Sequence, residues 1–323
     1  MKKRALITGI SGQDGSYLAE YLLSRNYEVH GCARETMNQT STNFLNQVIY
    51  HKADITVEDV FNKVIDQVMP DEIYHLATGH EVGFTNVDFF KTQSIDVQST
   101  LFILNAMKQK YQKTKLFYAS SSRVFGQSKN YPQNEKTDFA PVSLYGISKL
   151  TSQNLIKLYR EQFGLFACSG ILFNHESPRR SEFFLPRKIT ATAARIKYGL
   201  ESKLELGDIS AQRDWGAAED FVKAFWLMLQ SNLAEDYVIG TGQLHSVQNI
   251  LEIVFSHLQL NWSDYVVLNT QFQRPAENYK ICADISKANS QLGWKPEISF
   301  KSLIIQMLEA DLVKAQSALG SKK

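Results

Sequence analysis

A chain of 323 residues is long enough to bury a large core in one or two domains. It is 44% hydrophobic and 21% charged, which is typical of a globular protein, and its formal net charge is only +2. Because the basic residues are not clustered, we expect neither a nucleic-acid nor a membrane-surface partner.

The three cysteines, Cys32, Cys168 and Cys282, are far apart, so they predict neither a disulfide framework nor a metal site. The basic first residues are followed at once by glycine and polar residues, unlike a signal peptide. No run approaches the roughly 18 apolar residues of a membrane span. We therefore expect a soluble, cytoplasmic protein without a resident metal.

Short apolar runs alternating with helical patterns predict a Rossmann-type α/β fold, a doubly wound parallel sheet with helices on both faces. In chain order, the predicted strands are 4–8, 27–32, 72–77, 115–119 and 165–173. Helical patterns lie at 17–23, 100–108 and 145–163. Past residue 174 the regularity fades, which predicts a smaller second part there.

The first strand runs directly into a glycine turn, TGISGQDG, before a helix. Glycines at this point allow a tight turn and close approach to a pyrophosphate, and the helix N-terminus offers N–H donors to it. A plain glycine turn is the weaker alternative in this strand–turn–helix frame. The expected cofactor-binding residues here are Thr8, Gly9, Gly12, Gln13, Asp14 and Gly15, joined by Ile55, Leu76 and Ala77 near the ends of neighbouring strands.

The type of cofactor depends on the end of the second strand. A carboxylate there favours the ribose 2′-hydroxyl of NAD, and an arginine favours the 2′-phosphate of NADP. Arg34 is followed by Glu35, so the signal is mixed and favours NADP, with NAD possible. Asp54 could hold the adenine edge, or it could belong to the N-cap region of a helix.

Tyr145 and Lys149 are four residues apart at the start of a predicted helix, which puts both on one face. A lysine ammonium there can stabilise a phenolate, and a phenolate can take a proton from a hydroxyl while hydride leaves the same carbon. YxxxK alone is common by chance. The glycine turn and the serine-rich strand end at 120–122 make chance a poor explanation.

These motifs resemble the extended short-chain dehydrogenase/reductase family, and most closely the GDP-mannose 4,6-dehydratases, over nearly the whole chain. The resemblance is carried by ALITGISGQDGSYLAEYLL, GILFNHESPRR, RKIT, QRDWGAAEDFVKAFWLMLQ, RPAENY and LGWKP. It implies an NADP-binding domain over most of 1–173. It also implies a discontinuous nucleotide-sugar domain over most of 174–323. Some segments of 174–323 would belong to the first domain.

The resemblance also implies residue roles. Tyr145 and Lys149 would be catalytic and would also touch the cofactor, and Ser121 would help to polarise the C4 oxygen. The GDP-sugar would be held by Asn174, Lys188, Arg213, Arg274 and Glu277, whose charges suit a diphosphate and a guanine. Glu176, Arg179 and Arg180 lie in the same signature and could touch ligand, a neighbouring subunit or only the fold. Relatives of this kind are typically homodimers or homotetramers.

The chain departs from the resemblance at the position of the catalytic glutamate and in the loop after the strand at 72–77. The dehydratases read Ser–Thr–Ser–Glu at the serine-rich strand end, where the glutamate removes the C5 proton, and this chain has Arg123 in its place. A guanidinium has no lone pair to offer, so we count Arg123 in the catalytic site but not as a base. His80 and Glu81 are new ionisable groups in a loop that faces the sugar in this family. Either could be a relocated base, but pairing of Glu81 with Arg123 is the preferred interpretation, with Glu81 at the substrate.

The sequence therefore favours an NAD(P)-dependent enzyme acting at C4 of a GDP-hexose or related GDP-sugar, as a 4-keto reductase, dehydrogenase or epimerase, without dehydration. One alternative is a GDP-mannose 4,6-dehydratase with a relocated base. Another is a catalytically silent, cofactor-bound sensor or partner subunit, which the retention of Ser121, Tyr145 and Lys149 opposes.

Overall fold

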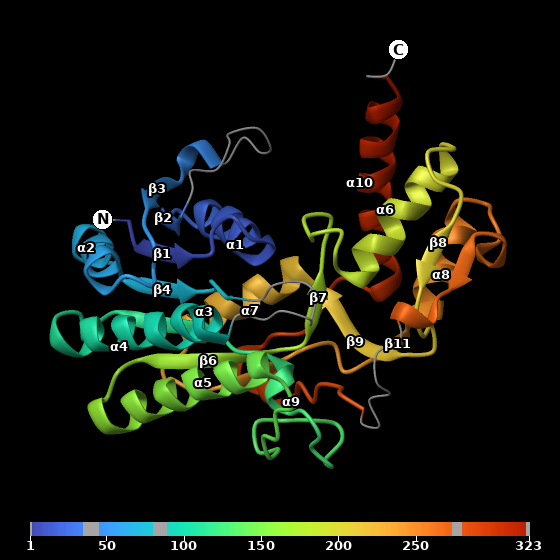
Figure 1. Ribbon diagram of the computed structural model, residues 1–323. Coiled ribbons are helices and arrows are strands. Elements are labelled where there is room, and N and C mark those ends of the chain that lie inside the picture. The colour runs from blue at the N-terminus through green and yellow to red at the C-terminus, as the bar shows by residue number, and fades with distance from the viewer. Residues whose placement is uncertain (1, 35–44, 80–88, 273–279, 321–323) are drawn as a thin grey trace.

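The computed structural model describes residues 2–34, 45–79, 89–272 and 280–320 (Figure 1). Its centre is a seven-stranded sheet in the order β10-β6-β5-β4-β1-β2-β3, and every neighbouring pair of its strands is parallel. The strands are β1 (Arg4–Thr8), β2 (Glu28–Ala33), β3 (Ile49–Lys52), β4 (Glu72–His75), β5 (Lys115–Ala119), β6 (Ala167–Leu172) and β10 (Tyr237–Ile239). The predicted fold class is confirmed.

The strand order reverses between β1 and β4. From β1 the chain builds outward through β2 and β3, then returns to place β4 on the other side of β1. In such sheets, ligands bind beyond the carboxyl ends of the strands at this reversal. The glycine turn follows β1 and the serine-rich segment follows β5, so the topology brings both motifs to the same edge.

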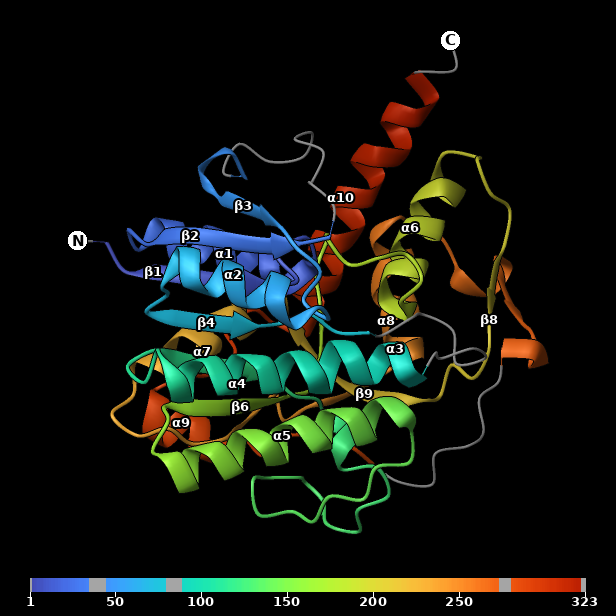
Figure 2. The same cartoon turned by 60° about the vertical axis from the view of Figure 1, so that its left-hand side comes forward.

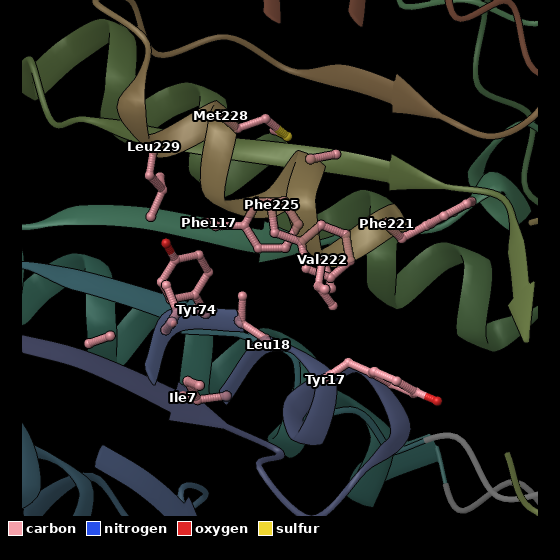
Figure 3. Packing of buried hydrophobic residues seen from close by; sticks show 14 of the residues in the cluster. Ile7, Tyr17, Leu18, Tyr74, Phe117, Phe221, Val222, Phe225, Met228 and Leu229 are labelled. Atoms are coloured by element: carbon pink, nitrogen blue, oxygen red, sulfur yellow. The ribbon is translucent and has the colours of Figure 1, made fainter. Parts of the chain in front are cut away.

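Helices cover both faces of this sheet. On one face lie α1 (Gln13–Ser24), α7 (Ala218–Gln230) and α9 (Ser286–Leu292); on the other lie α2 (Glu58–Val68), α4 (Ser99–Gln109) and α5 (Leu144–Phe163), with α4 and α5 side by side in Figure 2. The first face buries more aromatic side chains than the second, and Phe117 of β5 stacks on Phe225 of α7 with ring centroids 4.4 Å apart (Figure 3). Burial on both faces explains why the strands read as continuous apolar runs.

The predicted bounds are close to the observed ones, with β4 ending at His75 and β6 covering only Ala167–Leu172. Shorter elements link the main ones: η1 (Leu45–Gln47), α3 (Phe89–Gln93), the π-helical turn η2 (Ser94–Gln98), η3 (Ser122–Val124), η4 (Trp262–Asp264) and η5 (Thr270–Phe272). Helix α5 begins where the Ser143 hydroxyl accepts a hydrogen bond from the Gly146 N–H, and ends at Gly164 with φ of 66°.

A second core lies beside the sheet. It is built by α6 (Leu185–Lys197), α8 (Val247–His257) and α10 (Phe300–Gly320), with the two-stranded pair β8 (Leu204–Leu206) and β12 (Val266–Leu268). A three-stranded sheet of β7 (Asn174–Glu176), β9 (Gln212–Ala217) and β11 (Leu244–Ser246) lies between the two cores. Along the described ranges, no helix is both long and apolar enough to span a membrane.

Candidate active site

The turn after β1 needs its glycines. Gly9 has φ of 73°, and a Cβ there would lie 2.9 Å from the Ala77 nitrogen. A Cβ on Gly15 would collide with the backbone of Gly9 and Ile10, so this glycine lets α1 pack against the turn. At Gly12 the nearest described atom to a Cβ is the Gly9 carbonyl oxygen at 3.2 Å, so its outer side is open. An open glycine at the N-terminus of α1 fits the pyrophosphate of a dinucleotide.

The side chains of Gln13 and Asp14 turn toward β7. The Gln13 amide donates to the carbonyl of His175 at 3.1 Å, and Asp14 Oδ2 lies 2.9 Å from His175 Nε2. Burial opposes both charges, but the pairing prevails: it lowers the pKa of Asp14 and raises that of His175. These two predicted cofactor residues therefore join the cofactor turn to the strand that carries Asn174.

Thr8 holds the end of β4 beside the turn. Its hydroxyl lies 2.7 Å from Nδ1 of His75 and accepts a hydrogen bond from the Ala77 N–H at 3.2 Å. The Leu76 N–H donates to the Thr8 carbonyl at 3.3 Å. Thr8 thus fixes the segment that carries Leu76 and Ala77 beside the glycine turn, and that these residues contact a cofactor stays a prediction.

The residues predicted for the adenosine end lie beyond β2 and β3. Arg34 is exposed directly after β2, and Ile55 is buried. Asp54 accepts hydrogen bonds from the N–H and the hydroxyl of Thr56 at 2.9 and 2.7 Å, so it holds the turn before α2. Burial opposes the Asp54 charge, but these bonds and Arg34 lower its pKa. Glu35 lies outside the described residues.

Tyr145 and Lys149 lie on one face of α5, as predicted. The Lys149 side chain is 2% exposed, and its Nζ is 5.6 Å from the centre of the Tyr145 ring. A Cβ on Gly146 would lie 2.7 Å from the Arg123 carbonyl oxygen, so α5 begins directly against the serine-rich segment. This close approach places Tyr145 next to residues 121–123.

The three serines of this segment differ in role. Ser120 is buried and donates to Gln153 Oε1 at 2.7 Å, and Ser122 is also buried. Ser121 is half-buried and caps η3, where its oxygen accepts the Arg123 N–H at 3.2 Å. Its hydroxyl hydrogen is left to donate elsewhere, which suits Ser121 for a substrate oxygen.

A small pocket brings together three of the predicted site residues, Arg123, Asn174 and Arg213. Its wall is completed by Ser122, Phe173, Asp214 and Ile281. Asn174 lies on β7 and Arg213 on the neighbouring strand β9. Two guanidinium groups beside an amide favour an anionic ligand such as a diphosphate.

The other predicted substrate residues are not among those that line this pocket. Lys188 on α6 donates to the Glu205 carbonyl at 2.7 Å and lies 4.5 Å from the centre of the Phe272 ring; burial lowers its pKa. Arg274, Glu277, His80 and Glu81 lie outside the described residues, so the predicted Glu81–Arg123 pair stays a prediction.

The signature after β7 makes contacts within the chain. Arg179 pairs with Glu20 of α1 at 2.6 Å, and Arg180 lies 3.4 Å from Glu176. Arg179 also lies over the Tyr17 ring at 3.9 Å. These contacts connect the segment after β7 to the helix that follows the cofactor turn.

Sequence reasoning missed two buried carboxylates. Asp96, in the π-helical turn η2, lies 3.1 Å from Lys149 Nζ. Asp214 accepts the backbone N–H groups of Thr241, Gly242 and Ala283 at 2.9, 2.9 and 3.1 Å beneath the Arg213 pocket. An aspartate within an apolar helical pattern was the available signal for Asp96. The partners of Asp214 are distant in sequence and carry no local signal.

Comparison with known proteins is consistent with this geometry. The family model described as GDP-mannose 4,6 dehydratase matches residues 6–307. The chain belongs to this family. The GDP-mannose 4,6 dehydratase 2 of Arabidopsis thaliana is 43% identical over 98% of this chain and 88% of its own length. A Vibrio cholerae member of the family is 38% identical over 98% of this chain and 95% of its own length.

A solved structure shows the same fold. RMD from Pseudomonas aeruginosa, complexed with NADPH, superposes with a TM-score of 0.82 and is 25% identical, covering 97% of this chain and all of that one. The family membership and the fold make this chain an extended short-chain dehydrogenase/reductase-type nucleotide-sugar enzyme.

Proposed function

We propose that this member of the family catalyses NADP-dependent hydride transfer at C4 of a GDP-hexose or related GDP-sugar and does not dehydrate it. The observation that carries the proposal is Arg123, whose backbone lies against Gly146 at the start of α5 and which lines a pocket with Asn174 and Arg213. A guanidinium stays protonated and has no lone pair, so it cannot remove the C5 proton as the family's glutamate does.

The chain's own residues suffice for proton transfer at C4. Tyr145 takes the proton of the 4-hydroxyl in oxidation and returns it in reduction, and Lys149 stabilises the phenolate. Ser121 donates a hydrogen bond to O4. Arg123 binds a substrate hydroxyl or steers the sugar, and Arg213 and Asn174 face the diphosphate.

NADP fits the cofactor side. The open glycine at the start of α1 would hold the pyrophosphate, Arg34 the 2′-phosphate, and Leu76 and Ala77 the neighbouring wall. Bound there, it supplies or accepts the hydride. The fold match to a structure complexed with NADPH supports this choice. NAD would be favoured if the arginine at the end of β2 made no contact with the cofactor.

A second candidate is GDP-mannose 4,6-dehydration with a base supplied by His80 or Glu81. The names of relatives 43% and 38% identical to this chain favour it. Dehydration also begins with oxidation at C4, so it would use Tyr145 and Lys149 in the same way. The two candidates differ in whether a group of the protein removes the C5 proton and helps the 6-hydroxyl to leave after oxidation at C4.

Mass analysis of products separates the candidates. The protein is incubated with GDP-mannose, a GDP-heptose and their 4-keto-6-deoxy derivatives, each with NADP(H) or NAD(H). We expect a change of two hydrogens coupled to oxidation or reduction of the nucleotide. Loss of water from a GDP-hexose at an ordinary turnover rate would overturn the proposal in favour of dehydration. Cofactor binding without any conversion would indicate the silent subunit instead.

A further inference from the structure

Lys149 lies in a part of the fold that water does not reach. Its side chain is 2% exposed, and its partner Asp96 is fully buried. A buried ammonium is costly, and burial alone can lower the pKa of a lysine by about 3–5 units. A lysine whose pKa fell by the larger of these amounts would be mostly neutral near pH 7, and a neutral amine cannot stabilise a phenolate. The site therefore needs a counter-ion.

Asp96 is placed by the backbone to be that counter-ion. Its main-chain carbonyl accepts hydrogen bonds from Thr100 of α4 at 2.6 Å and from Ser152 of α5 at 2.9 Å. Ser152 lies one turn beyond Lys149, so the π-helical turn is fixed against the helix that carries the catalytic pair. Within the described ranges, no hydrogen-bond donor other than Lys149 reaches the Asp96 carboxylate.

The geometry assigns Asp96 as a positioning residue: its carboxylate keeps Lys149 an ammonium and holds that ammonium beside Tyr145. This inference rests on the proposed acid/base role of Tyr145, but not on which product forms. Asp96 acts through Lys149 and need not touch substrate or cofactor.

The other groups that face Lys149 cannot replace Asp96. They are Tyr118 of β5, Tyr145 itself, and His75 of β4. Burial and the Lys149 charge lower the pKa of His75 to about 3, so it is neutral at working pH, and burial raises the pKa of Tyr118 above its usual range. For Lys149, burial lowers the pKa, but Asp96 and then the two tyrosines raise it above its usual value. Among these groups, Asp96 is the one that contributes a carboxylate to Lys149.

The decisive measurement is the acid limb of the pH profile of kcat/KM for conversion of GDP-mannose with NADP⁺. In Asp96→Asn the side chain keeps its shape but loses its charge, so Lys149 gives up its proton and the phenolate loses its cation. We expect the limb to move to higher pH by about one unit or more, with lower turnover near neutral pH. An unmoved limb, or one displaced to lower pH, would show that Lys149 stays charged unaided and would overturn the assignment.

Asp311→Asn is the matched control, because Asp311 is also a buried carboxylate paired with a cation, Arg187, in the second core. Asp311→Asn should lower the free energy of unfolding and leave the acid limb of the kcat/KM profile at the same pH. The acid limb is measured on total conversion of GDP-mannose, because loss of the 4-hydroxyl proton accompanies oxidation at C4, and dehydration also begins with that oxidation. A dehydrated product would therefore overturn the proposed function and leave this test intact.

A double-mutant cycle tests the pair without any reaction. Denaturant midpoints are compared for Asp96→Asn, Lys149→Met and the double variant. We expect Asp96→Asn to lose less stability when Lys149 is already Met, because no uncompensated charge then stays buried. Equal losses in both backgrounds, or a double variant that does not fold, would mean that Asp96 does not act through Lys149.

Discussion

At the scale of single residues, the fold determines which chemical groups can meet. The four-residue spacing of Tyr145 and Lys149 is local, so a helix alone predicts that they share a face. The Lys149–Asp96 pair joins residues 53 positions apart and depends on the packing of the π-helical turn η2 against α5. The sequence could therefore predict that Tyr145 and Lys149 lie together, but not that Asp96 pairs with Lys149.

Arg123→Glu places a carboxylate, which can act as a base toward the C5 proton, at the position where this chain has a guanidinium. We expect this variant to release water from GDP-mannose, because a carboxylate beside Tyr145 can remove the C5 proton after oxidation at C4. Acid–base assistance is worth about 10²–10⁴-fold, so the gain should be visible by mass spectrometry. Arg123→Gln is the control that removes the charge without adding a base. Water loss from the unmodified protein equal to that of Arg123→Glu would exclude this role.

Tyr145→Phe tests the catalytic assignment directly. It removes the hydroxyl and keeps the ring, so we expect turnover to fall by about 10²–10⁴-fold and NADPH affinity to fall much less, because only one predicted cofactor contact is lost. Stopped-flow turnover and fluorescence titration of NADPH on the same preparation separate the two effects. Turnover left intact would remove Tyr145 from the mechanism, whichever product is formed.

At the scale of elements, the carboxyl ends of β1, β4 and β5 meet at one edge because the sheet is parallel and reverses its order beside β1. This convergence could be predicted from alternating strands and helices. The contacts between the glycine turn and β7 could not be predicted, because they depend on how the chain after residue 174 packs against the large sheet. The Asp14–His175 pair is the observed result.

The Asp14–His175 pair should make stability depend on pH. The pKa of His175 is raised above its ordinary 6.5, so its contribution is complete below that value and is lost as pH rises through the folded-state pKa. The pKa of Asp14 is lowered below 3.8, so its contribution is complete above that value and is lost as pH falls through its folded-state pKa. Both contributions are complete between the two ordinary values.

His175→Gln reveals this window in urea unfolding. We expect a loss of about 1–3 kcal/mol near pH 5–6, because a buried charged hydrogen bond is broken, and a smaller loss toward pH 9. His257→Gln is the comparison, since His257 pairs with Glu309 at a more exposed position. A loss that stays constant from pH 5 to pH 9 would mean that the charge on His175 contributes nothing.

At the scale of the whole molecule, the pocket lined by Arg123, Asn174 and Arg213 lies where the large sheet meets the three-stranded sheet. Asp214 of β9 is central to this junction. Its carboxylate accepts backbone hydrogen bonds from the loop after β10 and from Ala283, so it joins the three segments. Burial raises the pKa of Asp214, while the converging donors lower it in part. These segments lie far apart in the sequence, and nothing in their local patterns predicts that they meet.

Asp214→Asn should weaken GDP binding more than NADPH binding. The amide replaces one acceptor oxygen with a donor that faces backbone N–H groups, so the wall that carries Arg213 should loosen. We expect GDP affinity to fall about tenfold or more in calorimetry, which is about 1.4 kcal/mol, with NADPH affinity within about threefold of the parent. Asp220→Asn is matched to it, because Asp220 is buried and accepts the backbone N–H groups of Glu297 and Ile298 in the sheet half. Equal losses of GDP affinity in both variants would trace the effect to general destabilisation, whereas a loss confined to Asp214→Asn would connect the junction of the two cores to recognition of the nucleotide.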